Sequence, residues 1–354
     1  MQENFKILIK RIFTLFIIKI IIKIKNKYLY KRAFHLYNFE IKKRSRLNIS
    51  DYKKLAVDLE LYTNELYVPN VFYGIANQLK KYVNYSSNYQ IKAVIEHGAY
   101  FSDYCWESDI NAKLPAIFCT GEKRYSVLKN ITDKRIFKIG PSIAYASNYL
   151  NNKELNNEKE RLGKNLLVFP LHSTHWIYVN YNIENFCNFI NDIAKDFDHV
   201  RICLYWKDIL RGHAEIYERY GFEYVTAGHI YDPNFLPRLR SIIESSTITM
   251  SNGLGEQVGF CIYFKKPHYL IREDSYYTVD DRFVDECNSR LDLYNNDKDV
   301  NLFYKLFGEL RDNISQHQFD LIDLYWGLNE VKTKDELKSL FNISKDLYKN
   351  YLIK

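Results

Sequence analysis

Short apolar runs alternate with amphipathic stretches in the first half of the chain, and this alternation predicts its elements. Residues 68–83 predict a turn and an amphipathic helix, and residues 91–98 predict a strand. Residues 115–130 predict a strand followed by a helix, and residues 135–141 a further strand. Apolar runs of four to six residues between turn signals are typical of buried parallel strands. We therefore expect an α/β lobe here.

The alternation is most regular between residues 166 and 271, where it predicts a second lobe. The predicted strands are 166–172, 200–206, 223–228, 247–252 and 267–271, and the predicted helices are 182–197, 209–221, 234–246 and 255–266. Strands that alternate with helices in this way form a doubly wound parallel sheet. The predicted fold class is α/β with two Rossmann-like lobes.

Three further stretches complete the predicted organisation. Residues 151–165 are polar and lack an apolar period, which favours a linker between the lobes. The C-terminal stretch predicts helices and no strand–helix alternation. The predicted regions are a basic N-terminal helical segment (1–50), a first lobe (51–150), a second lobe (151–280) and a helical tail (281–354).

Charge is distributed unevenly between the N-terminal segment and the rest of the chain. The net charge is +7, but residues 1–50 alone carry +11, so that the remainder carries −4. A nucleic-acid-binding domain needs a basic patch or stripe on its folded surface. A mildly acidic body argues against nucleic acid as a partner.

The N-terminal segment has the composition of a membrane-surface helix. Its longest uncharged run, residues 12–18, is far shorter than the ~20 apolar residues that a spanning helix requires. Lys19, Lys23 and Lys25 interrupt the apolar stretch, which argues against a signal peptide. Lysines spaced through Ile, Leu and Phe are typical of a helix lying in the membrane interface. The alternative is a first helix packed on the body of the protein.

The cysteines favour a reducing compartment. They are scattered, without a C-x-x-C pair, and some stand inside apolar runs, where a free thiol behaves as a small hydrophobic group. In a chain of this length such spacing favours reduced thiols and therefore a cytoplasmic protein. The six positions are Cys105, Cys119, Cys187, Cys203, Cys261 and Cys287.

The clearest candidate for a binding loop is S-N-G-L-G-E (residues 251–256), which joins a predicted strand to a predicted helix. Gly253 and Gly255 would let backbone amides approach a ligand, and the helix N-terminus favours phosphate. Glu256 is placed to accept hydrogen bonds from a ribose diol. The alternative is a tight turn in which Gly255 only opens the helix.

Other polar residues follow predicted strands, where ligands of parallel sheets bind. His172 and Ser173 follow the first strand of the second lobe, and Gly228 and His229 follow the third. His97 ends the strand 91–98 of the first lobe, and a histidine titrating near neutral pH is suited to general base catalysis. The alternative is a histidine that only holds the turn.

The segments E-H-G (96–98), F-P-L-H-S-T (169–174) and S-N-G-L-G-E-Q-V-G (251–259) together resemble a GT-B glycosyltransferase. The chain is similar to bacterial enzymes of capsule or lipopolysaccharide biosynthesis. The resemblance implies that the second lobe binds a nucleotide-sugar and the first lobe a glycan or lipid-linked acceptor. It implies neither a metal ion nor a cofactor. Together, the cysteines and the basic N-terminal segment favour the cytoplasmic face of the inner membrane.

The resemblance also implies roles for individual residues. It places the donor phosphates against Ser251, Asn252, Gly253 and Gly255, and the ribose against Glu256. His172 and Ser173 would line the donor phosphate, and Gly228 and His229 would flank the base. His97 is the candidate general base for the acceptor hydroxyl because of its position at the end of a first-lobe strand, with Glu96, Asp103 and Glu107 as substitutes.

The chain departs from the family pattern in two places. Many retaining members carry a second Glu eight positions after the first, where this chain has Phe264. The first lobe is also shorter than usual. The D-x-D metal site of the other glycosyltransferase architecture has one match, residues 196–198, which precedes a predicted strand. The sugar (hexosyl or sialyl/Kdo-type), the acceptor and the stereochemistry stay open.

Two other functions fit parts of the sequence. G-L-G-E-Q-V-G (253–259) with Glu273 matches the spacing of a dinucleotide site, which would make the protein an NAD(P)-type oxidoreductase. However, that fingerprint belongs in the first βα unit of a sheet, and here it falls in the last. A non-catalytic scaffold with the GT-B shape is the second alternative.

Overall fold

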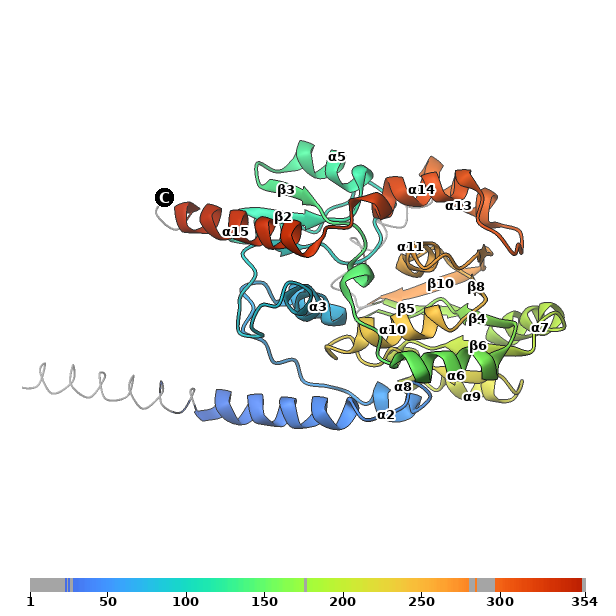
Figure 1. Cartoon of the computed structure of the whole chain (residues 1–354). Coiled ribbons are helices and arrows are strands. Elements are labelled where there is room, and N and C mark those ends of the chain that lie inside the picture. Colours follow the sequence, from blue (N-terminus) through green and yellow to red (C-terminus); the bar gives the residue numbers. More distant parts are fainter. Residues whose placement is uncertain are drawn as a thin grey trace, which may run out of the picture. The chain divides into compact units, whose positions relative to one another are not determined.

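The computed structural model describes residues 23, 25, 28–174, 177–279, 284 and 297–351 (Figure 1). They fall into two compact units. The smaller consists of the described part of Met1–Arg46 with Leu59–Tyr62, and the larger of Leu47–Asp58 and Thr63–Lys354. None of the helices formed by these residues combines the length and the apolar character that a bilayer crossing requires.

The smaller unit is built on one helix. Residues 28–44 form a helix, in agreement with the helical segment predicted for the N-terminus. The ring of Tyr62 lies against Tyr30, Phe34 and Tyr37, with centroids 4.6, 5.6 and 6.5 Å away. Most of the apolar stretch on which the membrane prediction depends lies outside the described residues.

The first lobe contains a parallel three-stranded sheet in the order β1-β2-β3. The strands are β1 (Val94–Ile95), β2 (Ala116–Cys119) and β3 (Arg135–Lys138), each inside a segment predicted as a strand. Ile117 and Cys119 pack with Leu128 of α5 (Glu122–Ile131). Because successive side chains of a strand point to opposite faces, Phe118 faces the other side.

The second lobe contains a parallel five-stranded sheet in the order β7-β6-β4-β8-β9. All five predicted strands are confirmed, with shorter bounds: β4 (Asn165–Phe169), β6 (His199–Cys203), β7 (Glu223–Val225), β8 (Ile248–Ser251) and β9 (His268–Leu270). The chain runs outward from β4 through β6 to β7, then returns to β8 on the other side of β4. The strand order therefore reverses between β4 and β8.

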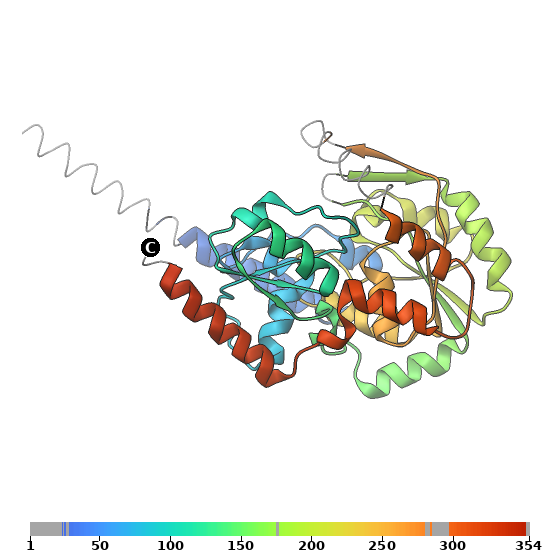
Figure 2. The same cartoon turned by 90° about the horizontal axis from the view of Figure 1, so that it is seen from above.

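Helices cover both faces of this sheet (Figure 2). Leu166 and Val168 of β4 pack with Phe186 of α7 on one face. On the other face, Arg201 of β6 donates to Ile242 O of α10 and to Oγ of Ser245, which follows that helix. The helices are α7 (Ile183–Ala194), α8 (Trp206–Leu210), α9 (His213–Glu218), α10 (Phe235–Glu244) and α11 (Glu256–Tyr263).

The predicted helix 209–221 is two helices, α8 and α9. Gly212 separates them and adopts φ +83°, a left-handed conformation that ends the first helix. Trp206, which we predicted at the end of a strand, is the first residue of α8 and packs in the core. The sequence therefore predicted the helical region but missed its break.

An antiparallel ribbon of β5 (Ile177–Tyr181) and β10 (Ser275–Val279) was not predicted. The segments pair Tyr181 with Ser275 and Ile177 with Val279 across almost a hundred residues of sequence. Tyr276 is 68% exposed and Tyr277 37%. Strand prediction depends on an alternation of apolar and polar residues. The two adjacent exposed tyrosines of β10 interrupt that alternation.

The segment predicted as a linker is helical and forms α6 (Asn152–Leu162). Asn151 and Glu154 form a capping box: the Asn151 side chain accepts from the Glu154 amide, and the Glu154 carboxylate accepts from the Asn151 amide. Within α6 only Leu155 and Leu162 are buried. Two apolar positions are too few to give a visible helical period, so the stretch looked like a loop.

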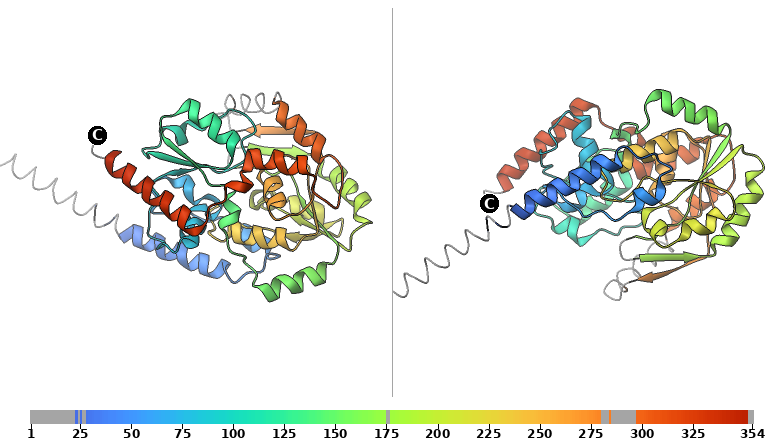
Figure 3. Two further views of the ribbon diagram at one scale, coloured as in Figure 1. Left: turned by 45° about the horizontal axis from the view of Figure 1, so that its top comes forward. Right: turned by 90° about the horizontal axis from the view of Figure 1, so that it is seen from below.

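The described part of the tail is helical, as predicted, and it contacts both lobes (Figure 3). α14 packs against α5 of the first lobe and α11 of the second. A Cβ atom added to Gly259 of α11 would meet the Trp326 ring at 2.2 Å. Phe341 stacks on Phe118 at 5.8 Å and an angle of 4°. The helices are α13 (Lys298–Phe307), α14 (Gln316–Trp326) and α15 (Lys334–Tyr351).

Short helices complete the described fold. They connect the sheets and carry residues of the site. They are α2 (Tyr52–Ala56), η1 (Val68–Gly74), α3 (Ile75–Tyr82), α4 (Glu107–Asn111), η2 (Ser142–Tyr145) and η4 (Leu328–Glu330).

Candidate functional site

Asn252 joins the loops at the carboxyl ends of three strands of the second lobe. Its Oδ1 accepts from the Leu171 amide at 2.6 Å, and its Nδ2 donates to Glu273 Oε2 at 3.2 Å. These residues follow β8, β4 and β9, and Asn252 is fully buried. Ligands of doubly wound sheets bind where the strand order reverses, outside the carboxyl ends of the strands. Asn252 and its two hydrogen bonds lie at that position.

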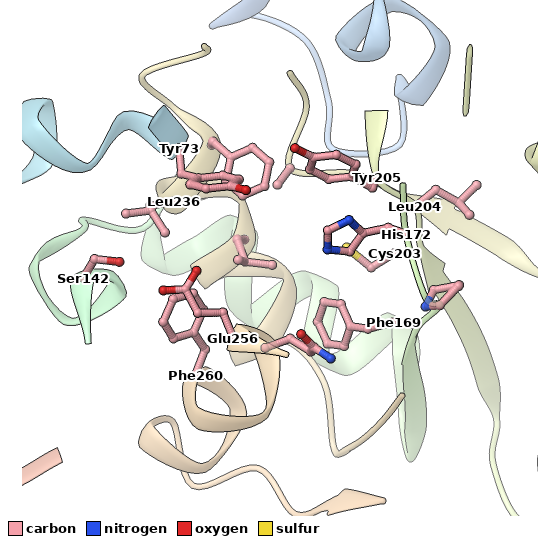
Figure 4. A pocket seen from close by; sticks show the side chains of 15 residues that line it. Tyr73, Ser142, Phe169, His172, Cys203, Leu204, Tyr205, Leu236, Glu256 and Phe260 are labelled. Carbon is pink, nitrogen blue, oxygen red and sulfur yellow. The ribbon is translucent and has the colours of Figure 1, made fainter. Parts of the chain in front are cut away.

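Two cavities flank the loop that contains Asn252. The first cavity encloses about 110 Å³ and draws its lining from both lobes (Figure 4). Most of its walls are apolar or aromatic. The lining residues are Tyr73, Ser142, Phe169, Pro170, His172, Cys203, Leu204, Tyr205, Ala227, Phe235, Leu236, Leu239, Glu256, Gln257 and Phe260.

Glu256 is the acidic group of the first cavity. It is the first residue of α11, and its carboxylate accepts a hydrogen bond from the Gly98 amide of the first lobe. Burial raises the pKa of Glu256 to about 7, and the hydrogen bond from Gly98 opposes that rise. A carboxyl group with such a pKa is half protonated at neutral pH and can accept or donate a proton. The sequence predicted the residue but not its protonation.

His172 forms another wall of the first cavity. Its ring stacks on Tyr205, with centroids 4.4 Å apart, and its Nδ1 lies 3.2 Å from the Ser173 carbonyl oxygen. Figure 4 shows the imidazole and the Glu256 carboxyl group on different sides of the cavity. The structure therefore brings two predicted donor-site residues, His172 and Glu256, to one cavity.

Tyr73 lines the first cavity and was missed by sequence reasoning. Its backbone is left-handed, with φ +58°, and its amide donates to the Ile230 carbonyl oxygen at 2.7 Å. Its side chain hydrogen-bonds Tyr205, and burial raises the pKa of the Tyr73 hydroxyl, as does the nearby Glu256 carboxylate. Tyr73 is one of 31 tyrosines in the chain, and nothing in the sequence around it marks a site.

The second cavity has a volume of about 500 Å³, and Asn252, Gly253 and Leu254 of the same loop form part of its wall. It also takes its walls from both lobes and from α13. The lining residues are Ala99, Tyr100, Phe101, Ser102, Tyr104, Leu171, Ile177, Asn252, Gly253, Leu254, Arg272, Glu273, Asp274, Ser275, Tyr277 and Tyr304.

The residues predicted to cradle phosphate are tightly packed. A Cβ atom added to Gly253 would lie 2.2 Å from Leu171 Cδ2, and one added to Gly255 would lie 2.5 Å from Gln257 Oε1. Ser251 Oγ donates to the Gly253 carbonyl oxygen and lies 2.9 Å from His268 Nε2. The Ser251 and Asn252 side chains are thus engaged inside the protein, and the Leu254 amide donates to the Tyr304 hydroxyl.

The other predicted donor residues are not among the described residues that line either cavity. Ser173 is buried, and its Oγ accepts from Arg211 at 2.7 Å and from the Val179 amide at 3.2 Å. His229 stacks on Trp206 at 4.0 Å, and its Nε2 lies 3.1 Å from Asp58 Oδ1.

Gly228, beside His229, has φ +91°, and a Cβ there would lie 3.1 Å from Arg238 Nη1. The left-handed turn and the close packing therefore explain why a glycine occupies this position. The structure does not bring Ser173, Gly228 or His229 to the cavities that His172 and Glu256 line.

His97 lies beside the first cavity rather than among its described lining residues. Its ring packs against Phe72 and Tyr73, with centroids 5.1 and 6.4 Å away. The preceding residue, Glu96, is buried and pairs with Arg124, with Nε to Oε2 at 3.1 Å. The Glu96–Arg124 pair therefore fixes the turn that presents His97 and Gly98.

Within the described ranges, no group of three or more His, Cys, Asp or Glu side chains could hold a metal ion. The D-x-D triplet at 196–198 stands before β6, at the opposite end of that strand from the cavities. There Asp198 accepts from the Lys164 amide at 2.8 Å. The five described cysteines, Cys105, Cys119, Cys187, Cys203 and Cys261, are free thiols.

The chain matches no protein-family model. A search of curated proteins also finds no match. Among solved structures, the chain is similar to the wall teichoic acid polymerase TagF, with 13% identity and a TM-score of 0.39. The match covers 69% of this chain and 60% of that one, so this chain spans less than two thirds of that protein. A likeness at this level identifies neither a substrate nor a reaction.

Proposed function

We propose that the protein is a glycosyltransferase that transfers a sugar from a nucleotide-sugar to a glycan or lipid-linked acceptor. One observation carries the proposal: the cavity between the lobes, at the reversal of strand order, contains Glu256 hydrogen-bonded to Gly98 of the other lobe. A transferase must bring two substrates together and manage a proton between them. A titratable carboxyl group between two lobes suits that requirement.

In this proposal the donor binds the second lobe. The backbone of the Gly253–Gly255 loop and the start of α11 would receive the phosphates, as helix N-termini commonly do. His172 and Glu256 would contact one group of the donor in the first cavity, whose volume of about 110 Å³ is smaller than the ~300–1,000 Å³ of a complete small-molecule site. The acceptor hydroxyl would lose its proton to His97 as the sugar–phosphate bond breaks. No metal ion or cofactor takes part.

The oxidoreductase alternative receives less support. The G-L-G-E-Q-V-G segment follows β8, the fourth strand of its sheet along the chain, whereas a dinucleotide fingerprint follows the first. Glu273, which would hold a ribose in that alternative, accepts a hydrogen bond from Asn252 inside the loop cluster. A scaffold without turnover would keep the same cavities, and an assay of turnover separates it from an enzyme.

We also propose that the N-terminal segment attaches the enzyme to the cytoplasmic face of a membrane. Residues 1–50 carry a net charge of +11, and each basic residue near an anionic surface contributes about 1 kcal/mol. A chain lacking residues 1–30 should move from the membrane to the soluble fraction and still bind nucleotide. A truncated chain that unfolds would instead show that the segment packs on the body.

The central experiment is a thermal-shift screen of the full chain with UDP-, GDP-, dTDP- and CMP-sugars, followed by a transfer or hydrolysis assay. A cognate donor at 100 times its Kd should stabilise the protein by about 2.7 kcal/mol. NAD and NADP serve as controls for the oxidoreductase alternative. Stabilisation by a dinucleotide, with none by any nucleotide-sugar, would contradict the proposal.

A further inference from the structure

We propose that the second cavity binds an uncharged polyhydroxylated group, a sugar or a polyol, and disfavours phosphorylated ligands. The cavity shares Gly253 with the proposed phosphate loop, whereas His172, Gly255 and Glu256 are not among the described residues that line it. That this group is the acceptor rests on the proposed function. The binding itself depends only on the walls of the cavity.

The wall from the first lobe is held in place. Arg124 Nη1 donates to the Tyr104 carbonyl oxygen at 2.9 Å, and its guanidinium lies 4.1 Å from the Tyr100 ring centroid. Phe101 packs against Phe303 and Trp326, with centroids 5.5 and 5.7 Å away. A binding site needs side chains whose positions are fixed before the ligand arrives. The segment 99–104 meets that condition.

The floor of the second cavity is also fixed. Asn252 bonds both Leu171 and Glu273, and the Leu254 amide donates to the Tyr304 hydroxyl at 3.3 Å. These bonds connect the ends of three strands with α13. A volume of about 500 Å³ falls in the range of ~300–1,000 Å³ that is typical of small-molecule sites.

The charges of the second cavity disfavour an anion. Of the described residues that line it, Glu273 and Asp274 are acidic and Arg272 is basic. The Arg272 guanidinium is already engaged: it lies 4.3 Å from the Tyr304 ring centroid and donates to Asn301 Oδ1 at 2.9 Å. Burial raises the pKa of Glu273, the hydrogen bond from Asn252 opposes that rise, and the neighbouring Asp274 carboxylate adds to it. A phosphate group would add further negative charge to this cavity.

The same walls suit a polyol. Carboxylates accept hydrogen bonds from hydroxyl groups, and bonds to charged groups are the stronger kind. Tyr100, Tyr277 and Tyr304 contribute rings with a flat apolar body and a polar tip, which match the C–H faces and hydroxyls of a sugar. Acidic and aromatic side chains in one cavity therefore favour a neutral polyhydroxylated ligand.

The test is saturation-transfer NMR on the full chain with glucose, maltose and glucose 6-phosphate as separate probes. Glucose or maltose should receive saturation from the protein, and glucose 6-phosphate should receive much less. Asp274→Ala should weaken the binding about tenfold, as loss of a bond to a charged group predicts. Tyr277→Ala should also weaken it, whereas Tyr276→Ala, the adjacent position whose side chain points to the opposite face, should not.

Asp274→Lys provides a second test. Because it replaces a negative charge by a positive one, it should raise the affinity of the cavity for glucose 6-phosphate. The proposal is overturned if neither neutral sugar binds, if the phosphorylated sugar binds better to the natural chain, or if Tyr276→Ala and Tyr277→Ala act alike. Failure here, together with nucleotide-sugar binding that Gly255→Val removes, leaves the transferase proposal standing. Sugar binding without any nucleotide binding leaves the cavity as a sugar site and contradicts the transferase.

Discussion

The Glu256 carboxylate in the second lobe accepts a hydrogen bond from the Gly98 amide in the first lobe. The contact ties the start of α11 to the turn that follows β1. It also places an ionisable group where both lobes meet. Its energy depends on protonation, because a charged carboxylate is the better acceptor and also the more costly group to bury.

We predict that Glu256→Gln makes the protein relatively more stable at pH 8 than at pH 5, compared with the natural chain. The folded pKa, about 7, lies above the ordinary value of 4.5, so the folded state binds more protons between these pH values. Stability from this group is complete below pH 4.5 and declines as pH rises through 7. The measurement is urea unfolding of both proteins at the two pH values. If the free energies of unfolding of the two proteins differ by the same amount at pH 5 and at pH 8, the raised pKa of Glu256 is contradicted.

His268 should give the opposite trend. It is buried between Ser251 Oγ and Thr249 Oγ1, at 2.9 and 2.8 Å, and burial lowers its pKa from 6.5 to about 3. Between these values the unfolded chain binds the extra proton, so stability falls as pH drops below 6.5, by at most about 1.4 kcal/mol per pH unit. His268→Gln should be less stable at pH 7 and show a shallower acid slope in the same unfolding experiment.

Gly255→Val tests the phosphate loop. The backbone φ at Gly255 is −160°, which any residue adopts, and the nearest obstacle is the end of the flexible Gln257 side chain. The variant should therefore fold, with a loss below about 1 kcal/mol. It should lose the stabilisation of about 2.7 kcal/mol that a saturating nucleotide-sugar gives. A normal thermal shift would remove the loop from the donor site.

Arg124→Ala should be strongly destabilising. Arg124 and Glu96 are both buried, and removal of one member leaves an uncompensated charge, which typically costs about 3–5 kcal/mol. Lys349→Ala is the matched control, because its partner Asp346 is also exposed and such pairs contribute about 0–1 kcal/mol. Chemical denaturation of both variants gives the comparison. Similar losses would show that the pair does not anchor the first lobe.

His97→Ala should reduce turnover by about 10²–10⁴-fold if His97 is the general base, with donor affinity unchanged. The rate of the natural chain should then fall at acidic pH as the imidazole is protonated. Near-normal turnover of the variant would show that His97 only stabilises the turn after β1. The base would then have to be sought at Glu256, which lies in the first cavity, before Glu96, whose carboxylate is bound by Arg124.

The central parallel strands were predictable because β2 and β4 are short, mostly apolar runs buried at every position, as burial on both faces of a sheet requires. The ribbon of β5 and β10 was not predicted, because the exposed aromatic residues Tyr276 and Tyr277 interrupt the alternation of apolar and polar positions in β10. Helix α6 was missed since only two of its residues are buried. In the site, Glu256 was found through its position after a glycine loop. Tyr73 comes from the other lobe and reaches the cavity only through the tertiary fold.

The stacking of Phe341 on Phe118 has a consequence for synthesis on the ribosome. The aromatic face of the first sheet leaves the ribosome early, but the helix that stacks on it, α15, follows roughly 220 residues later. At about 5–20 residues per second, Phe118 waits on the order of ten seconds or more for its partner. During that interval the nascent chain exposes an apolar surface of the kind that chaperones recognise. The first lobe therefore completes its packing after translation of the second.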